Sequence, residues 1–251
     1  MTARSGDGRR REKPELIADE VRALIVGGEL AEGDVLGQEP ELIERFGVSR
    51  PSLREALRIL EAEGLISVVR GAGGGVVVHE PDERMTARTA ALVLRARNVP
   101  LADVHEARRS LELHAVRAIA TSTPRTSSAA QLRALVEEQE RCIDDPDEFS
   151  SVNARFHEQL VALAGNQTMS IVAEMLNEIV ARAVTTVSQV PGEDSLATRR
   201  RGIRSQRRLV ELLAEGDEAA AEEHWHAHLT VVGKVLLGQQ AATMVDLLDH
   251  Y

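Results

Sequence analysis

The stretch Glu41–Val78, ELIERFGVSRPSLREALRILEAEGLISVVRGAGGGVVV, carries the pattern that decides the fold of the N-terminal part of this chain. It predicts a short helix over 39–46 and a second helix over about 51–63. Between them Gly47 breaks the first helix, and Ser49 stands at the N-cap position of the second. Two short helices joined by such a turn predict a helix-turn-helix.

The residues after this motif predict a β-hairpin. Two short runs rich in β-branched residues, 65–69 and 76–79, flank the glycine-dense turn at 70–75. A phosphate-binding loop is the alternative for these glycines, but the Gly-Lys-Ser/Thr of such a loop is missing and the turn joins two strands. Together with a preceding helix over 14–26, the hairpin predicts a winged helix-turn-helix.

Composition limits the remaining architecture. The chain has 251 residues, enough for two domains, and its 2% aromatic content predicts cores of Leu, Val, Ile and Ala in packed helices. Cys142 is the single cysteine, so no intrachain disulfide can form. No signal peptide or long apolar segment is evident, and we expect a cytoplasmic protein. Because the net charge is −10, the positive charge that would bind DNA must be concentrated on one part of the surface.

The positions of the proline and glycine residues indicate where helices end and so predict the domain organisation. After Pro81 every segment is helical in character, which predicts a mainly α protein with a small β-hairpin wing and a C-terminal all-α bundle. The predicted bundle helices are 84–97, 101–121, 128–144, 146–164, 167–190, 195–214 and 217–237. The predicted parts are a flexible basic arm (1–13), a winged helix-turn-helix (14–80), a linker (81–85), a helical ligand-binding and dimerisation domain (86–238) and a tail (239–251).

The second helix of the motif carries a basic stripe. Arg50, Arg54 and Arg58 recur at i, i+4 and i+8, while its leucines point elsewhere. A guanidinium can bind a guanine edge or a phosphate, so this face fits DNA. For Arg58 an ion pair with Glu55 or Glu61 along the helix is the alternative.

The motif resembles the winged helix of the GntR family, through Gly47-Val48-Ser49-Arg50, Leu53-Arg54-Glu55-Ala56-Leu57 and Glu63-Gly64-Leu65. The resemblance implies base contacts by Arg50 and Arg54. It implies DNA contacts at the helix start and wing tip by Ser49, Ser52, Arg70 and Gly71. Where the family often has an Arg, this chain has Pro40, so one contact is lost and the operator sequence should differ.

The segment 85–236 is similar to the FCD ligand-binding domain of the FadR subfamily. The residues that carry this similarity are Glu106-Ala107-Arg108-Arg109-Ser110-Leu111-Glu112, Phe156-His157, Gly165-Asn166, Gly216-Asp217 and His228-Leu229.

Many members of that subfamily hold a divalent metal with one Asp and three His. The matching positions here are Asn153, His157, Gln206 and His228, in which two amides replace charged or imidazole ligands. Neutral amides would leave a buried dication uncompensated, so the sequence favours a polar pocket without metal. If an ion binds, Asn153, His157 and His228 are the expected ligands; no cofactor is otherwise implied.

Arg108 is the candidate anchor for an acidic effector, with an i, i+4 pair to Glu112 as the alternative. The arginines between 199 and 208 predict a solvated face or, alternatively, a site for the phosphates of an acyl-coenzyme A. His224 and His228 share a helix face, but histidines on a helix are more often surface residues than metal ligands. Trp225 is expected to fill the core or an interface.

We therefore expect a non-enzymatic, ligand-responsive transcription regulator. It should bind double-stranded DNA at an inverted repeat as a homodimer and respond to a carboxylic acid or acyl-coenzyme A. The alternatives are a metal-dependent hydrolase using His157 and His228, which lacks an evident nucleophile and base, and a non-catalytic scaffold.

Overall fold

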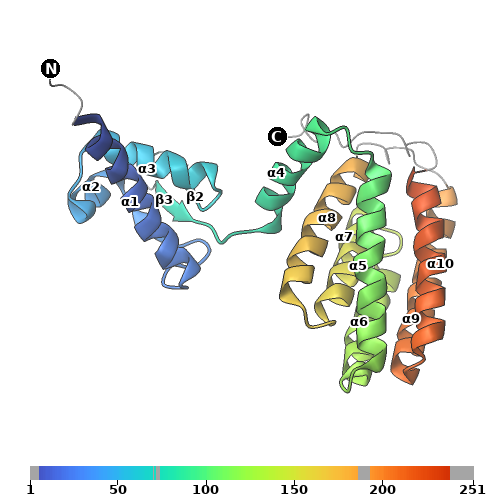
Figure 1. Ribbon diagram of the computed structural model, residues 1–251. Helices are drawn as coiled ribbons and strands as arrows, with labels where there is room; N and C mark the ends of the chain where they lie inside the picture. The colour runs from blue at the N-terminus through green and yellow to red at the C-terminus, as the bar shows by residue number, and fades with distance from the viewer. Residues whose placement is uncertain (1–5, 70, 72–73, 186–192, 238–251) are drawn as a thin grey trace. The chain divides into compact units, whose positions relative to one another are not determined.

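The computed structural model describes residues 6–69, 71, 74–185 and 193–237 (Figure 1). The chain divides into two compact units, 1–85 and 86–251. Each unit is described by itself.

The first unit is a winged helix-turn-helix, as predicted. Its elements are α1 (Gly6–Val26), β1 (Val35–Gly37), α2 (Glu39–Phe46), α3 (Arg50–Ala62), β2 (Ile66–Val69) and β3 (Gly75–Val78). The antiparallel sheet has the order β1-β3-β2, with Ile66 opposite Val78 and Val35 opposite Val77. Two features differ from the prediction: α1 begins at Gly6 rather than at Pro14, and β1 forms a third strand.

Helix α3 forms because its apolar residues return at helical spacing and bury one face. Leu53 and Leu60 are fully buried, and they pack with Val21 of α1 and Val78 of β3 in one core. Burial of such side chains stabilises the fold by about 1.5–3 kcal/mol each. This packing holds α3 in place while its opposite face stays exposed.

Two glycines set the ends of the motif helices. Gly47, at the C-cap of α2, has φ 59° and lets the chain turn into α3. Gly64 follows α3 with φ 74°, and a Cβ there would lie 2.7 Å from Cγ of Met85. Because Gly64 has no side chain, the backbone can adopt the left-handed turn there and Met85 can approach closely.

A polar link closes the base of the wing. His79, after β3, donates from Nδ1 to Oε1 of Glu32 at 2.8 Å, and its Nε2 lies 2.9 Å from Oγ of Ser67 on β2. The other oxygen of Glu32 accepts from the backbone N–H of Glu80 at 2.7 Å. These hydrogen bonds fix the loop between α1 and β1 to the open end of the hairpin, where β2 begins and β3 ends.

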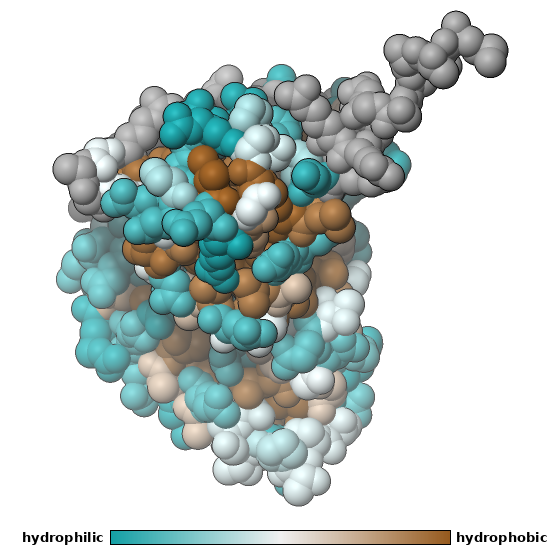
Figure 2. Space-filling model, turned by 90° about the vertical axis from the view of Figure 1, so that its left-hand side faces the viewer, coloured by the Kyte–Doolittle hydropathy of each residue, from teal (hydrophilic) through white to brown (hydrophobic). Residues whose placement is uncertain are grey.

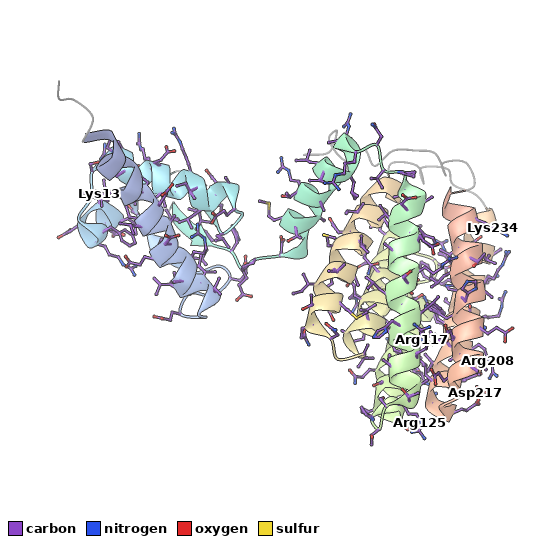
Figure 3. The ribbon with its side chains drawn as sticks, in the orientation of Figure 1. Lys13, Arg117, Arg125, Arg208, Asp217 and Lys234 are labelled. Carbon is purple, nitrogen blue, oxygen red and sulfur yellow. The ribbon has the colours of Figure 1, made fainter. Side chains whose placement is uncertain are left out.

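The second unit is a helical bundle, again as predicted. Its helices are α4 (Glu83–Ala96, which starts in the last residues of the first unit), α5 (Leu101–Thr121), α6 (Arg125–Arg141), α7 (Pro146–Ala162), α8 (Gln167–Thr185), α9 (Glu193–Glu215) and α10 (Glu218–Leu237). Helix α5 is central and packs against α7, α8, α9 and α10. Figure 3 shows Arg125 and Asp217 at one end of the bundle and Arg117 in the part of the bundle nearer to that end. Arg117 pairs with Glu222 of α10 at 2.7 Å.

The bundle core is aliphatic around a small aromatic centre. Phe156 and Trp225 are fully buried, with ring centroids 6.0 Å apart, among Leu and Val side chains of α5, α6, α7, α9 and α10. A smaller cluster joins Ala87 and Ala91 of α4 to α5 and α8. The polar groups described below therefore lie among buried apolar side chains.

Within the described parts of the chain, no helix combines the length and apolar character needed to cross a membrane. Figure 2 shows brown apolar side chains interspersed with teal hydrophilic ones on the face that it presents.

Candidate DNA-reading face and effector site

The start of α3 is ordered by two serines. Ser49 is the N-cap and accepts a hydrogen bond from the backbone N–H of Ser52 at 3.4 Å. The two hydroxyl oxygens lie 2.9 Å apart. Ser49 is exposed, whereas Ser52 is buried, so the structure places only the first of these candidate DNA contacts on the surface.

Two of the three predicted arginines meet a carboxylate of the preceding helix. The side chains of Arg50 and Arg54 are 62% and 59% exposed, and both approach Glu39, the first residue of α2. Arg54 donates from Nε and Nη2 to the two oxygens of Glu39 at 3.0 and 3.3 Å, and Arg50 Nε lies 3.2 Å from Oε1. Arg58 pairs along the helix with Glu55 at 3.4 Å, which is the alternative that the sequence left open.

The wing tip is described only in part. Gly71 is exposed and has φ 123°, a backbone conformation that favours glycine. Its carbonyl accepts from the N–H of Gly74 at 3.0 Å. Arg70, the other predicted wing contact, lies outside the described residues.

In the bundle, Glu112 of α5 is the centre of a buried polar network. Its Oε2 accepts from Nδ1 of His157 on α7 at 2.9 Å and from Nε1 of Trp225 on α10 at 2.8 Å. Arg108, one turn earlier on α5, brings Nε to 2.9 Å from Oε1 of Glu112, in an ion pair without hydrogen-bond alignment. His228 stacks on Trp225 with centroids 4.4 Å apart. Three helices thus converge on one carboxylate.

The environment fixes the charge of this network. Burial raises the pKa of Glu112, but attraction to His157 and Arg108 and the two hydrogen bonds outweigh it and lower the pKa to about 2. Burial lowers the pKa of His157 and lowers that of His228 to about 3. At neutral pH the site therefore contains one buried anion, one buried guanidinium and neutral imidazoles.

Asn153 and Gln206, the other two predicted pocket residues, bind each other. Gln206 of α9 is fully buried and donates from Nε2 to Oδ1 of Asn153 on α7 at 2.9 Å. The hydrogen bond from Nδ1 of His157 to Glu112 would suit a metal-binding imidazole, but no group of three His, Cys, Asp or Glu among the described residues could hold a metal ion. The residues present do not fit the divalent metal that the resemblance implies.

The structure also places the remaining polar candidates. His224 donates from Nε2 to the carbonyl of Ser205 at 2.8 Å, and His226 is exposed, so neither joins the Glu112 network. In the basic stretch of α9, Arg207 pairs with Glu140, Arg208 with Glu211 at 3.0 Å, and Arg199 lies over the ring of Phe149. His105 of α5, which the sequence did not single out, is buried and donates to the carbonyl of Leu229 at 3.1 Å.

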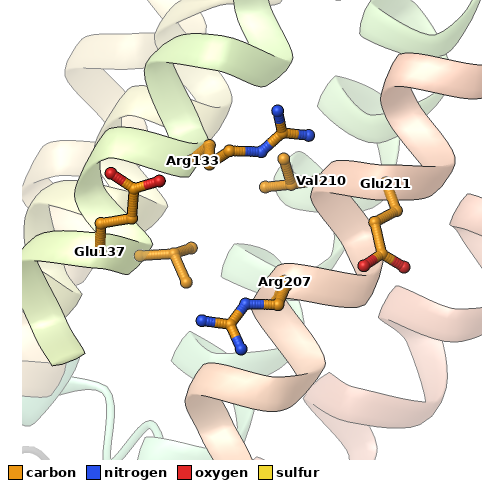
Figure 4. A pocket seen from close by; sticks show the side chains of 6 residues that line it. Arg133, Glu137, Arg207, Val210 and Glu211 are labelled. Carbon is orange, nitrogen blue, oxygen red and sulfur yellow. The ribbon is translucent and has the colours of Figure 1, made fainter.

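A shallow groove separates α6 from α9. It has a volume of about 210 Å³ and is lined by Arg133 and Glu137 of α6, by Arg207 and Glu211 of α9, and by two valines (Figure 4). Ligand sites usually have about 300–1,000 Å³. The groove is smaller than this and its charges balance, so it offers no preference for a charged ligand.

The contacts of two residues were not predicted from the sequence. Glu39 lies 11 and 15 residues before the arginines that it contacts, in another helix, and no local spacing rule relates them. Trp225 was expected in the core or an interface, but its hydrogen bond to Glu112, 113 residues away, depends on the packing of α5 against α10. The one feature of the sequence that draws attention to Trp225 is that it is the only tryptophan in the chain.

Two family models match this chain. The family "Bacterial regulatory proteins, gntR family" matches residues 14–76, and "FCD domain" matches residues 103–231. The structure of Streptococcus agalactiae GntR superposes with a TM-score of 0.62 at 21% identity, over 88% of this chain and 99% of that one. At this identity the likeness concerns the fold alone.

Among curated relatives, YcbG of Bacillus subtilis (strain 168), named an uncharacterized transcriptional regulator, is 28% identical over 88% of this chain and 89% of its own. LutR of the same organism is 26% identical over 86% and 97%. The "Putative L-lactate dehydrogenase operon regulatory protein" of Escherichia coli (strain K12) is 30% identical over 86% and 83%. These names are those of regulators and not of enzymes. The chain belongs to the GntR family of bacterial regulatory proteins and is a ligand-responsive, DNA-binding transcription regulator with an FCD domain.

Proposed function

We propose that this regulator reads its operator with the exposed face of α3 and with the wing, and that it acts as a homodimer of the FadR subfamily on an inverted repeat. The exposure of Arg50 and Arg54 beside the N-terminus of α3 carries this proposal. Their guanidinium groups suit guanine edges, and the helix N-terminus with Ser49 suits a phosphate. Ser52, Arg70 and Gly71 are assigned here by family resemblance.

The test is alanine substitution with a matched control on the same helix. Arg50→Ala or Arg54→Ala should each cost about 1–3 kcal/mol of base discrimination while the melting temperature stays unchanged. Arg58→Ala removes the same charge from an arginine that is 76% exposed and paired with Glu55. In a mobility-shift assay at fixed salt, equal operator affinities for all three variants would contradict the assignment.

Homodimer formation is tested separately. Sedimentation of the full chain should give twice the chain mass, and footprints should show two half-sites about 34–36 Å apart along the duplex, or a multiple of this spacing. A monomer protecting one half-site would contradict this part of the proposal.

We further infer that the effector is a small hydroxy acid bound at the Glu112 network. The supporting observations are that Oε1 of Gln206 is buried without a hydrogen-bond partner among the described residues, and that the ion pair between Nε of Arg108 and Oε1 of Glu112 lacks hydrogen-bond alignment. A buried polar group normally has a hydrogen-bond partner, so we infer that the ligand supplies one to Gln206 and aligned hydrogen bonds to the ion pair. A carboxylate would accept from Arg108, and a hydroxyl would donate to Glu112 or Gln206.

The relative named for an L-lactate dehydrogenase operon supports this ligand class. The alternative, an acyl-coenzyme A held by the arginines of α9, is less favoured because Arg207 and Arg208 already pair with carboxylates. Titration of the full chain with L-lactate, and with propionate as the matched acid lacking the hydroxyl, should give a larger thermal shift for L-lactate. Equal shifts would contradict the role of the hydroxyl, and no shift with either acid would contradict the site.

A further inference from the structure

The most specific arrangement outside the effector site is the contact of one carboxylate with both DNA-reading arginines. Glu39 is the first residue of α2, and its own helix start is fixed because the N–H of Gln38 donates to Oε2 of Glu41 at 2.8 Å. From this fixed position the Glu39 side chain, 31% exposed, reaches Arg54 at 3.0 Å and Arg50 at 3.2 Å.

The geometry of the Arg54 contact leaves the useful edge of the guanidinium free. Arg54 donates to Glu39 from Nε and from Nη2, that is, with its side edge. A guanidinium has further N–H donors on Nη1 and Nη2, which form the end edge. A guanine presents O6 and N7 in the major groove, and an arginine binds them bidentately. Glu39 therefore holds Arg54 by one edge and leaves the other edge available to a base.

The same contact lowers the attraction of the two arginines for phosphate. Affinity for any DNA sequence comes mainly from phosphate neutralisation, which is independent of sequence. A carboxylate within about 3 Å of both guanidinium groups offsets part of their charge and repels phosphates that approach without a correct base contact. Fixing a side chain before binding also reduces the entropy lost on binding.

We propose that Glu39 is a positioning residue that determines operator specificity, by presenting the end edge of Arg54 to a base and by weakening sequence-independent binding through Arg50 and Arg54. This inference rests on the proposed DNA-reading face. It adds that discrimination between sequences depends on an acidic residue of α2 that does not itself read a base.

The experiment compares Glu39→Gln with Glu55→Gln in the full-length protein. Both remove one negative charge from the same unit, but the partner of Glu55 among the described residues is Arg58. The probes are a duplex that the wild-type protein selects from a random-sequence pool and a scrambled duplex of equal composition, at fixed salt. The measured quantity is the ratio of the two affinities, and melting temperatures confirm that each variant is folded.

We expect Glu39→Gln to lower this ratio about tenfold, mainly because binding to the scrambled duplex becomes tighter and preference at one base pair relaxes. Glu55→Gln should change the ratio less than about twofold, since an exposed pair contributes little. In an Arg54→Ala background, Glu39→Gln should lower the ratio much less than in the wild type, because the two residues act through one contact.

Equal ratios for Glu39→Gln and Glu55→Gln would overturn the role of Glu39 while leaving the DNA-reading face intact. Additive effects of Glu39→Gln and Arg54→Ala would also overturn it, because a purely structural role of Glu39 does not depend on Arg54. If the wild-type protein selects no sequence from the pool, the DNA-reading face itself fails and this inference fails with it.

Discussion

Glu112 is a buried carboxylate that three other side chains of the bundle contact. It is 1% exposed and is held by Arg108, His157 and Trp225 from three helices. A buried ion pair stabilises little relative to apolar side chains, but removing one partner leaves an uncompensated charge. The network therefore makes the bundle sensitive to single substitutions and to pH.

The first prediction concerns Arg108. Arg108→Ala should lower the free energy of unfolding by about 3–5 kcal/mol, because Glu112 loses its buried counter-charge. Adding Glu112→Gln should recover part of this loss. The measurement is urea denaturation, with Arg117→Ala as the control, since the Arg117–Glu222 pair is partly exposed and should contribute about 0–1 kcal/mol. Equal losses for Arg108→Ala and Arg117→Ala would contradict the role given to the network.

The second prediction is a decline in stability with acid. His228 in the folded state has a pKa of about 3 instead of 6.5, so the unfolded chain binds a proton first and stability falls as the pH drops from about 6.5 to 3. The lowered pKa values of His105 and His157 act in the same direction. Glu112, with a pKa of about 2 instead of 4.5, adds a loss between about pH 4.5 and 2.

Thermal unfolding of the wild type between pH 7 and 4 should therefore show a steadily falling melting temperature. His228→Phe keeps an aromatic ring to stack on Trp225 and should flatten this slope, because one titrating group is removed. An unchanged slope in His228→Phe would show that this imidazole is not held neutral by its surroundings.

At the scale of the elements, the pairing of α7 with α9 through Asn153 and Gln206 yields the third prediction. Asn153→Asp with Gln206→His supplies a charged oxygen and a third imidazole beside His157 and His228. The double variant should gain a Zn²⁺- or Ni²⁺-dependent rise in stability, about 2.7 kcal/mol when free metal is about 100 times Kd. The wild-type chain should show no such rise, and stoichiometric metal in the purified wild type would contradict this interpretation.

The elements themselves were largely predictable. Gly47, Gly64, Pro100, Pro146 and the glycine at 216 ended or started helices where the sequence indicated, because these residues act locally through φ and missing N–H groups. The three-residue strand β1 was not predicted, since it is held by pairing with β3 and has no period of its own. Helix α1 extends before Pro14 although a proline inside a helix removes one hydrogen bond and crowds the preceding turn; the Arg and Lys residues there are good helix formers.

At the scale of the whole molecule, the division into a DNA-binding and an effector unit was also readable from sequence. The composition changes from a hairpin pattern to uninterrupted helices near Pro81, and the two units separate at residues 85 and 86. The spacing of residues in the sequence did not predict which side chains pair between helices. These pairs are Glu39 with Arg54, Glu112 with Trp225, and Gln206 with Asn153. Such contacts depend on how helices pack in three dimensions, and each supplies part of a proposed function.

The polar link at the base of the wing determines when the first unit can fold during synthesis. Glu32 binds His79 and the N–H of Glu80, and β1 pairs with β3, across separations of 39 to 48 residues. Chains fold from the N-terminus as they leave the ribosome, and contacts between distant residues form late. Helices α1 and α3 can form early, but the sheet stays open until Glu80 has emerged. During that interval the nascent chain exposes unpaired strand edges, and it is then most exposed to association with other chains.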